Sequence, residues 1–513
     1  MATGCDKDLL KNPAVKLPPL EELRQIAADL RLKTSDEEIE YIHEHMKDVV
    51  KTYGRVNELV EPQLPVKYPR TPGYRATDDD SWYWKCEIKG SPTGKLAGKR
   101  VGIKDNVAVA GVPMMNGSKI LEGYTPEFDA TIITRILDAG GIITGKTVCE
   151  DMCLSGSSWN ASTGPVKNPL NKKLSAGGSS SGSASLLVRN EIDLAIGADQ
   201  GGSIRIPASW CGIVGLKPTF GLVPYTGICS IETTLDHVGP MARTVKDCAL
   251  LLEVIAGYDE GRDPRQIPSI PVPAYSKSAD DGIKGMKIGL LKEGFEFKEI
   301  QQDVAAVVRL AASKLTQGGA TVEDTSIPLH ADGLAIWTPT SFEGEYNCMV
   351  KGNGTGYNWK GHYPLSMQEA LARGFNTRPY DMSYPLKLVC VIAEYMSRNY
   401  QNKFYAKGLN LTNALTMAYD QALKTYDVLI MPTLPMKALP LPTDSTSLKE
   451  LIALSLGMMK NTAPFDSTGH PALSINAGLS EGLPVGMMIV GRKFDEETIF
   501  KVASAFEKIR DRE

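Results

Sequence analysis

The chain has 513 residues, 42% of them hydrophobic, which is enough apolar material for a large core and for more than one compact unit. Its 56 basic and 60 acidic residues leave a formal net charge of -4, so the charge balance favours neither nucleic acid nor an anionic membrane as a partner. A small neutral substrate fits this balance better.

The nine cysteines are scattered and odd in number, a pattern typical of reduced thiols rather than of a disulfide framework. The first residues are polar, and no apolar run reaches the length of a membrane span. We therefore expect a soluble, cytoplasmic protein.

Residues 19–61 carry helical patterns. Leu20, Leu23 and Ala27 share one face, and Ser35 with Glu38 forms a capping box before a second helix. Residues 62–80 are rich in Pro, Tyr and Asp without periodicity, which predicts a linker that wraps over a neighbouring surface. Together these features predict a helical N-terminal domain and linker over residues 1–84.

After residue 99, short apolar runs alternate with helical patterns, which indicates an α/β architecture. The predicted strands are 101–103, 142–144, 192–196, 287–291, 320–324, 428–431 and 485–490, and the clearest helices are 130–139, 303–317 and 496–508. One large α/β domain is expected over residues 85–513. Its aromatic segment 330–403 looks irregular and is expected to cover the core.

Two Gly-Gly-Ser loops flank one apolar strand. Residues 176–184 read AGGSSSGSA, and residues 199–207 read DQGGSIRIP. Glycines let backbone N–H groups approach a ligand closely, and consecutive amides can form a cradle for negative charge. A single Gly/Ser loop is just as often a flexible connector, so neither loop decides the matter alone.

Lys104 supplies a third element, because it closes the apolar strand in VGIKDN, residues 101–106. A serine hydroxyl is a weak nucleophile that needs an adjacent base. Lysine can be that base only when neutral, and burial lowers its reference pKa of about 10.4. A lysine at the end of a buried strand meets this requirement, although such a lysine taken alone is usually solvated.

The three segments together resemble the amidase signature family. The resemblance continues through CGIVGLKPT at 211–219, DHVGP at 236–240 and TAPFDSTGHP at 462–471, and spans residues 85–505. The string CEDMCLSGSS at 149–158, the Asp-Gln pair before Gly-Gly-Ser and the helical extension are most similar to bacterial amidases associated with nitrile hydratase. The resemblance implies a large mixed β-sheet core sandwiched by helices.

It also implies a catalytic set of Lys104, Ser179 and Ser203, with a cis peptide bond before Ser179 and no metal or other cofactor. Carboxylic amides would be hydrolysed to carboxylate and ammonia through an acyl-enzyme on Ser203. The oxyanion would rest on backbone N–H groups of Gln200, Gly201, Gly202 and Ser203.

Three further residues of these motifs are given roles on the same resemblance. Ser180 supports the site or merely fills the loop, and Leu154 lines the acyl pocket or is ordinary core. Arg205 is expected to pair with a buried carboxylate or carbonyl. A homodimer formed with help from the helical N-terminal part is compatible with the pattern.

Other functions stay open beside this one. Transfer of an amide group within a multi-subunit complex occurs in the same family. Residues 140–147, GGIITGKT, match the P-loop string, but a helical pattern precedes them and a strand lies inside.

Residues 178–182 match the nucleophile elbow with Ser180 at its centre and His237 or His470 as base, but a polar loop precedes them. His43 and His45 point to different faces of a helix and are not expected to bind metal.

Overall fold

The computed structural model describes residues 15–357 and 360–512, and the chain divides into two compact units at Gln63/Leu64. The first unit contains helices α1 (Leu20–Asp29) and α2 (Asp36–Glu58). Its small core is formed by Leu23, Ala27 and Ile39. The predicted capping box is present, since the Ser35 hydroxyl accepts from Glu38 N at 3.2 Å and Ser35 N donates to Glu38 Oε2 at 2.7 Å.

The larger unit begins earlier than the expected boundary at residue 85. The Tyr68 hydroxyl donates to Asp138 Oδ1 at 2.8 Å, which holds the predicted linker on the surface of this unit. Strand β1 (Tyr74–Arg75) pairs with β2 (Trp82–Lys89), which crosses the expected boundary. The sequence hides β2 because its pairing with the next strand shifts register twice, so the alternation of buried and exposed residues is broken.

The larger unit is built on one mixed sheet of twelve strands in the order β1-β2-β4-β3-β7-β9-β8-β13-β14-β12-β10-β11. After β2 the strands are β4 (Ile142–Thr147), β3 (Arg100–Lys104), β7 (Leu194–Asp199), β9 (His237–Ala242), β8 (Val214–Lys217), β13 (Ala472–Ser480), β14 (Leu483–Val490), β12 (Val428–Pro432), β10 (Lys287–Leu291) and β11 (Thr321–Thr325). All seven predicted strands are confirmed within a few residues.

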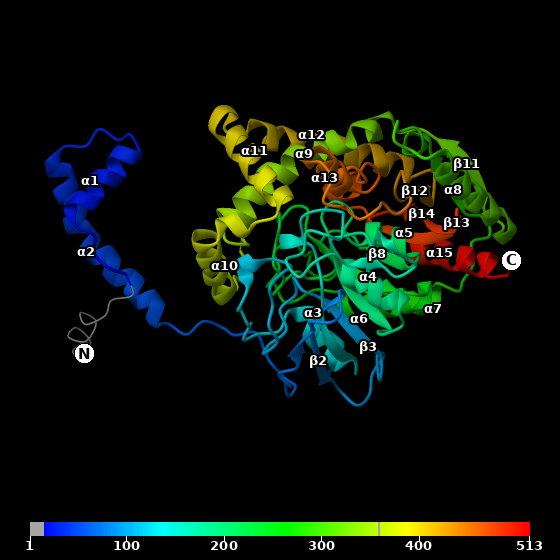
Figure 1. Ribbon diagram of the computed structural model, residues 1–513, viewed down its shortest axis with the longest axis horizontal. Coiled ribbons are helices and arrows are strands. Elements are labelled where there is room, and N and C mark those ends of the chain that lie inside the picture. Colours follow the sequence, from blue (N-terminus) through cyan, green and yellow to red (C-terminus); the bar gives the residue numbers. More distant parts are fainter. Residues whose placement is uncertain (1–14, 358–359, 513) are drawn as a thin grey trace. The chain divides into compact units, whose positions relative to one another are not determined.

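Helices cover both faces of this sheet (Figure 1). Along β7, Leu194 and Ile196 join the largest hydrophobic cluster, whereas Ala195 between them joins a different cluster. Because successive strand residues point to opposite faces, both faces of β7 are buried. The helices are α3 (Thr131–Asp138), α4 (Ser181–Val188), α5 (Arg205–Cys211), α6 (Val245–Ile255), α7 (Tyr275–Ser278), α8 (Gln302–Lys314), α9 (Gly333–Glu345), α10 (Leu365–Thr377), α11 (Tyr384–Tyr400), α12 (Lys403–Ala422), α13 (Leu448–Leu456), α14 (Ala463–Thr468) and α15 (Glu496–Arg510).

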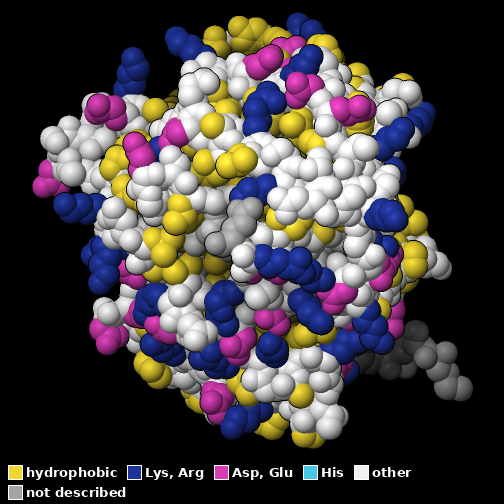
Figure 2. Space-filling view, turned by 90° about the vertical axis from the view of Figure 1, so that its right-hand side faces the viewer, with side chains coloured by type: hydrophobic (Ala, Val, Ile, Leu, Met, Phe, Trp, Pro, Cys, Tyr) yellow, Lys and Arg dark blue, Asp and Glu magenta, His cyan; other side chains and the backbone are white. Residues whose placement is uncertain are grey.

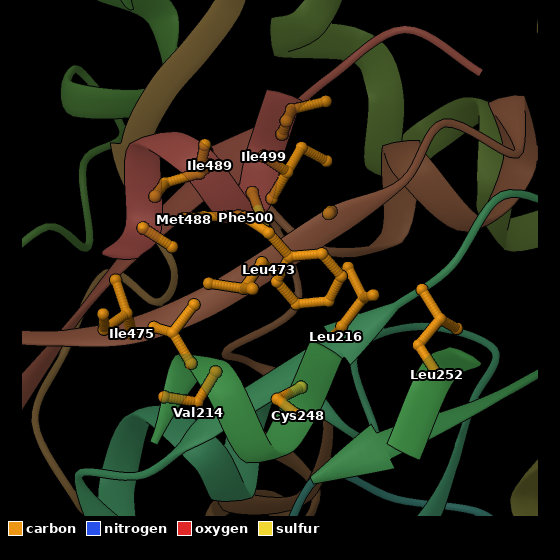
Figure 3. Close-up of a cluster of buried hydrophobic side chains, with 14 of the residues drawn as sticks. Val214, Leu216, Cys248, Leu252, Leu473, Ile475, Met488, Ile489, Ile499 and Phe500 are labelled. Carbon is orange, nitrogen blue, oxygen red and sulfur yellow. The ribbon is translucent and has the colours of Figure 1, made fainter. Parts of the chain in front are cut away.

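The largest cluster joins the middle of the sheet to its helical cover. Figure 3 shows side chains from β8, β13, β14, α6 and α15 pointing toward one another, with Phe500 among them. At about 1.5–3 kcal/mol for each large apolar side chain, such burial is the main source of stability here. Burial of these side chains fixes β8 and β9 on the side of β7, and the second Gly-Gly-Ser loop follows the end of β7.

The expectation that residues 330–403 are irregular is wrong. The segment contains α9, α10 and α11, and α9 packs against α11, α12 and α14. Pro339 lies inside α9, and the helix is buried on several sides, so it lacks the one-sided apolar stripe that reveals a helix in a sequence. The expectation that this segment covers the core stays a prediction.

Residues 140–147 do not form a P-loop, because α3 precedes them and β4 runs through them. On the face seen in Figure 2, basic and acidic side chains lie among one another, so neither sign forms an extended field. Across residues 15–357 and 360–512, no helix combines the length and apolar character needed to cross a membrane.

Candidate active site

The predicted residues meet at one edge of the sheet. Strands β3 and β7 are parallel neighbours, so Lys104 at the end of β3 and the loop after Asp199 of β7 lie at the same edge. The first Gly-Gly-Ser loop reaches this edge from the other side, just before α4. Main-chain contact ties the two loops together, since Ser180 N donates to Ser203 O at 3.2 Å.

Lys104 and Ser179 form the buried centre of the arrangement. Lys104 Nζ donates to Ser179 Oγ at 2.7 Å and to the carbonyl of Ala198 at 3.1 Å. Both side chains are completely buried. The Gly178–Ser179 peptide bond is cis, and a Cβ on Gly178 would lie 1.8 Å from the carbonyl oxygen of Ser157. Only glycine fits at that position.

Ser203 lines a pocket that opens beside this centre, and its side chain is nearly buried. Within the described part of the chain, the N–H groups of Gly201 and Ser203 donate to no protein acceptor. Gly202 differs from the expectation, because its N–H donates to Asp199 Oδ1 at 2.6 Å. Its φ of +138° and a Thr462 hydroxyl that would lie 2.6 Å from an added Cβ explain why glycine stands there.

A buried charge cluster holds the second loop. Arg205 donates to both carboxylate oxygens of Asp199 at 3.0 Å, to Asp466 at 2.6 Å and to the carbonyl of Thr462 at 3.0 Å. This confirms the structural reading of Arg205. Burial alone would raise the pKa of Asp199, but the Arg205 guanidinium outweighs it and lowers that pKa well below its usual range. Asp199 is thus a fixed anion that also anchors Ile204 N at 3.0 Å.

Ser180 does not act as the centre of a nucleophile elbow. Its hydroxyl lies 3.3 Å from both the N–H and the carbonyl of Ala198, so it fastens the loop to β7. His237 contacts the Leu235 carbonyl at 2.7 Å and His470 contacts Thr468 and Asp420, and neither lines the Ser203 pocket. The expectation that the segment before this loop is entirely loop is wrong. It contains the short strand β6 (Asn171–Ser175), which pairs with β5 (Lys167–Asn168).

The walls of the Ser203 pocket are mainly apolar. Its lining residues are Cys153, Leu154, Ser155, Gln200, Gly201, Ser203, Ile231, Trp337, Ser341, Phe342, Glu345, Val389, Leu456 and Met459. Leu154 is both a lining residue and a member of a buried hydrophobic cluster, so its two readings are compatible. Among the described residues, no group of three or more His, Cys, Asp or Glu side chains is placed to hold a metal ion.

Sequence reasoning missed Trp337 and Glu150, which shape this site. Trp337 Nε1 donates to the carbonyl of Gln200 at 2.8 Å, and it lies in the segment expected to be irregular. The buried Glu150 accepts from Ser157 Oγ at 2.7 Å and from Asn160, and burial raises its pKa to about 7. The string CEDMCLSGSS contained Glu150, but neither spacing nor period marked it.

Comparisons with known proteins agree with this geometry. The Amidase family model matches residues 79–500. The chain is 44% identical over 459 residues to an enantioselective amidase of Rhodococcus rhodochrous, which covers 89% of this chain and 88% of that protein. It is 36% identical over 451 residues to a subunit of the glutamyl-tRNA(Gln) amidotransferase of Methanosarcina mazei, which covers 87% of this chain and 92% of that one.

A solved structure with the same fold is the native peptide amidase from Stenotrophomonas maltophilia. The two match with a TM-score of 0.67 and 29% identity, over 82% of this chain and 84% of that one. Both the mixed twelve-stranded sheet and the sequence motifs are accounted for by this relationship. The chain belongs to the amidase family.

Proposed function

We propose that this amidase hydrolyses carboxylic amides through an acyl-enzyme on Ser203, with Ser179 as the proton carrier and Lys104 as the base. The observation that carries the proposal is the fully buried hydrogen bond of 2.7 Å between Lys104 Nζ and Ser179 Oγ, beside a pocket lined by Ser203. In general, burial away from water disfavours the charged form of an amine, and only the neutral form can accept a proton.

Each step has a group to perform it. Ser203 Oγ attacks the amide carbon as its proton passes through Ser179 to Lys104. The oxyanion is held by the turn from Gln200 to Ser203, chiefly by the N–H groups of Gly201 and Ser203, since Gly202 is engaged by Asp199. Ser179 then returns a proton to the departing ammonia, and water hydrolyses the acyl-enzyme to the carboxylate.

The acyl group occupies the Ser203 pocket, with Leu154 as part of its wall. Free thiols at the described cysteines suit a cytoplasmic setting. We also propose that α2 contributes to a homodimer, because Ile42, Val49, Tyr53 and Val56 expose apolar side chains along it.

The proposal is tested by Ser203→Ala in the full chain. Ammonia release from a graded panel of aliphatic and aromatic amides should fall by a factor on the order of 10⁴, with Ser179→Ala nearly as severe and neither variant unfolded. Mass spectrometry should find an added acyl group on Ser203 in the wild-type protein only.

Retained turnover by a folded Ser203→Ala variant would remove the assignment. If the wild-type chain hydrolysed no simple amide alone but gained activity with partner subunits, amide-group transfer would be the better reading. That second reading is favoured by one observation, the similarity to the amidotransferase subunit of Methanosarcina mazei.

A further inference from the structure

The Ser203 pocket contains a buried acid that the proposed mechanism does not use. One side of α9 contributes Trp337, Ser341, Phe342 and Glu345 to the pocket, at positions that fall on the same face of a helix. Glu345 is the last residue of α9, and its exposed fraction is 5%. A carboxyl group this deep in an apolar pocket is costly unless something pairs with it.

Two buried acceptor atoms on this pocket lack donors. Glu345 Oε1 accepts from the Ser341 hydroxyl at 2.7 Å, but no hydrogen bond to Glu345 Oε2 is found among the described residues. Gln200 Nε2 donates to the Tyr225 hydroxyl at 2.9 Å and to Asp236 Oδ1 at 3.0 Å, and Gln200 Oε1 also has no partner in the described chain. Both vacant atoms call for a donor rather than an acceptor.

Acidic side chains gather at this end of the pocket. Burial raises the pKa of Glu345 to about 8, and the nearby Glu232 and Asp236 carboxylates contribute to this rise. Arg265 is shared between Asp236, at 3.4 Å, and Asp263, at 2.7 Å. Across residues 15–357 and 360–512, no Lys, Arg or His forms an ion pair with Glu345 or Glu232. A cation entering the pocket would therefore favour the carboxylate form of Glu345 and pair with it.

We propose that the pocket selects amides whose acyl group carries a protonated amine, and that Glu345 binds this ammonium. The inference rests on the proposed function, since it places the amide carbon at Ser203. An ammonium group has three N–H donors and a charge, so it can supply the donor and the counter-charge that Glu345 Oε2 lacks, whereas a hydroxyl offers one donor and no charge. The apolar walls hold the carbon chain between the two ends.

The test compares matched substrates. Each ω-amino alkanamide, with three to six carbons in the acyl chain, is paired with the alkanamide in which a methyl group replaces the amine. Ammonia release gives kcat/KM for both members at pH 7. The expected result for the wild-type protein is a ratio of amine to methyl substrate that peaks at one chain length, where the ammonium reaches Glu345.

Glu345→Gln keeps the size of the side chain and its contact with Ser341 but removes the charge. At the preferred length, the ratio should fall by about 10- to 100-fold, the effect expected when a charged hydrogen bond is lost. Glu343→Gln is the matched control, because Glu343 lies on the same helix and does not line the pocket. It should leave the ratio as in the wild-type protein.

A second measurement needs no variant. Alkylammonium ions should inhibit hydrolysis of butanamide by the wild-type protein at least about tenfold more strongly than alcohols of the same length. Equal inhibition, or an unchanged ratio in a folded Glu345→Gln protein, would overturn the inference. In either case, continued loss of butanamide turnover in Ser203→Ala would leave the proposed function standing.

Discussion

Two buried lysines on neighbouring strands have opposite surroundings. Lys104 on β3 and Lys146 on β4 lie in parallel strands that pair with each other, and both side chains have no exposed surface. Lys146 Nζ lies 2.9 Å from Asp105 Oδ1 in an ion pair. Lys104 Nζ donates to neutral groups, the Ser179 hydroxyl and the Ala198 carbonyl, and no ion pair to Lys104 is found among the described residues.

The difference bears on the proposal that Lys104, and not Lys146, is the base. The Asp105 carboxylate is the ion-pair partner of Lys146, so this lysine holds Asp105 in place. Asp105 in turn accepts from the N–H groups of Met115 at 3.0 Å and Asn116 at 2.8 Å, which anchors the chain beyond β3. Among the described residues, Lys104 has no such charged partner and contacts only the Ser179 hydroxyl and the Ala198 carbonyl. The two buried lysines thus differ in whether a carboxylate pairs with them.

Replacing Lys104 by methionine should lower activity, whereas replacing Lys146 by methionine should lower stability. These are the largest effects that we expect. Lys104→Met removes the base and should lower kcat by about 10³-fold or more, while the protein stays folded, because no buried partner charge is left alone. Lys146→Met leaves Asp105 as an unpaired buried charge and should lower the free energy of unfolding by about 3–5 kcal/mol. Ammonia release and urea unfolding measure the two quantities.

The Lys146→Met protein is also the control for Lys104→Met, since it loses a buried amine of the same size one strand away. If Lys146→Met stayed folded but were as inactive as Lys104→Met, the ion pair would belong to the chemistry. If Lys104→Met kept wild-type kcat with chemistry as the slow step, another group would be the base.

A smaller effect should follow when Ser179 is displaced from Lys104 with both side chains kept. Gly178→Ala would place a Cβ 1.8 Å from the Ser157 carbonyl oxygen, so the backbone before Ser179 must move. A shift on the order of 1 Å can cost about 10²-fold in kcat. The variant should keep Lys104 and its neutral surroundings, so a loss of rate here measures the contact between Lys104 and Ser179.

Gly54→Ala is the matched control, because a Cβ at Gly54 meets nothing within 4 Å. Its kcat should equal that of the wild-type protein. A Gly178→Ala protein with normal kcat would mean that the loop absorbs the added methyl group without moving Ser179.

The sequence predicts a role for Lys104 but not for Lys146. Lys104 could be singled out because it closes the short apolar run of β3, and the resemblance to the amidase signature family implied Ser179 and Ser203 as its partners. Lys146 could not, because it lies in a string that matches a P-loop, and only the parallel pairing of β3 with β4 brings it to Asp105. Long-range pairing of this kind leaves no local trace in the sequence.

Helix α9 shows the same limit of sequence-based prediction. α9 contains Pro339 and is buried on several sides, so its sequence lacks the one-sided period that predicts a helix. As a result, Trp337 and Glu345, which line the Ser203 pocket, could not be placed from the sequence. Motifs located the proposed reacting groups, whereas the residues that shape the pocket depend on packing between distant segments.

A third buried lysine sharpens the comparison through the pH dependence of stability. Lys217, at the end of β8, donates to the carbonyl of Pro218 at 3.1 Å, and burial lowers its pKa from 10.5 to about 7. Between these two values the unfolded chain holds a proton on Lys217 that the folded chain does not. The free energy of unfolding should therefore rise with pH across this window, by about 1.4 kcal/mol per pH unit from this residue.

Lys217→Met removes that contribution, so urea unfolding at several pH values should give a wild-type curve that rises toward the variant curve from pH 7 to pH 10. Parallel curves would mean that Lys217 keeps its proton in the folded protein.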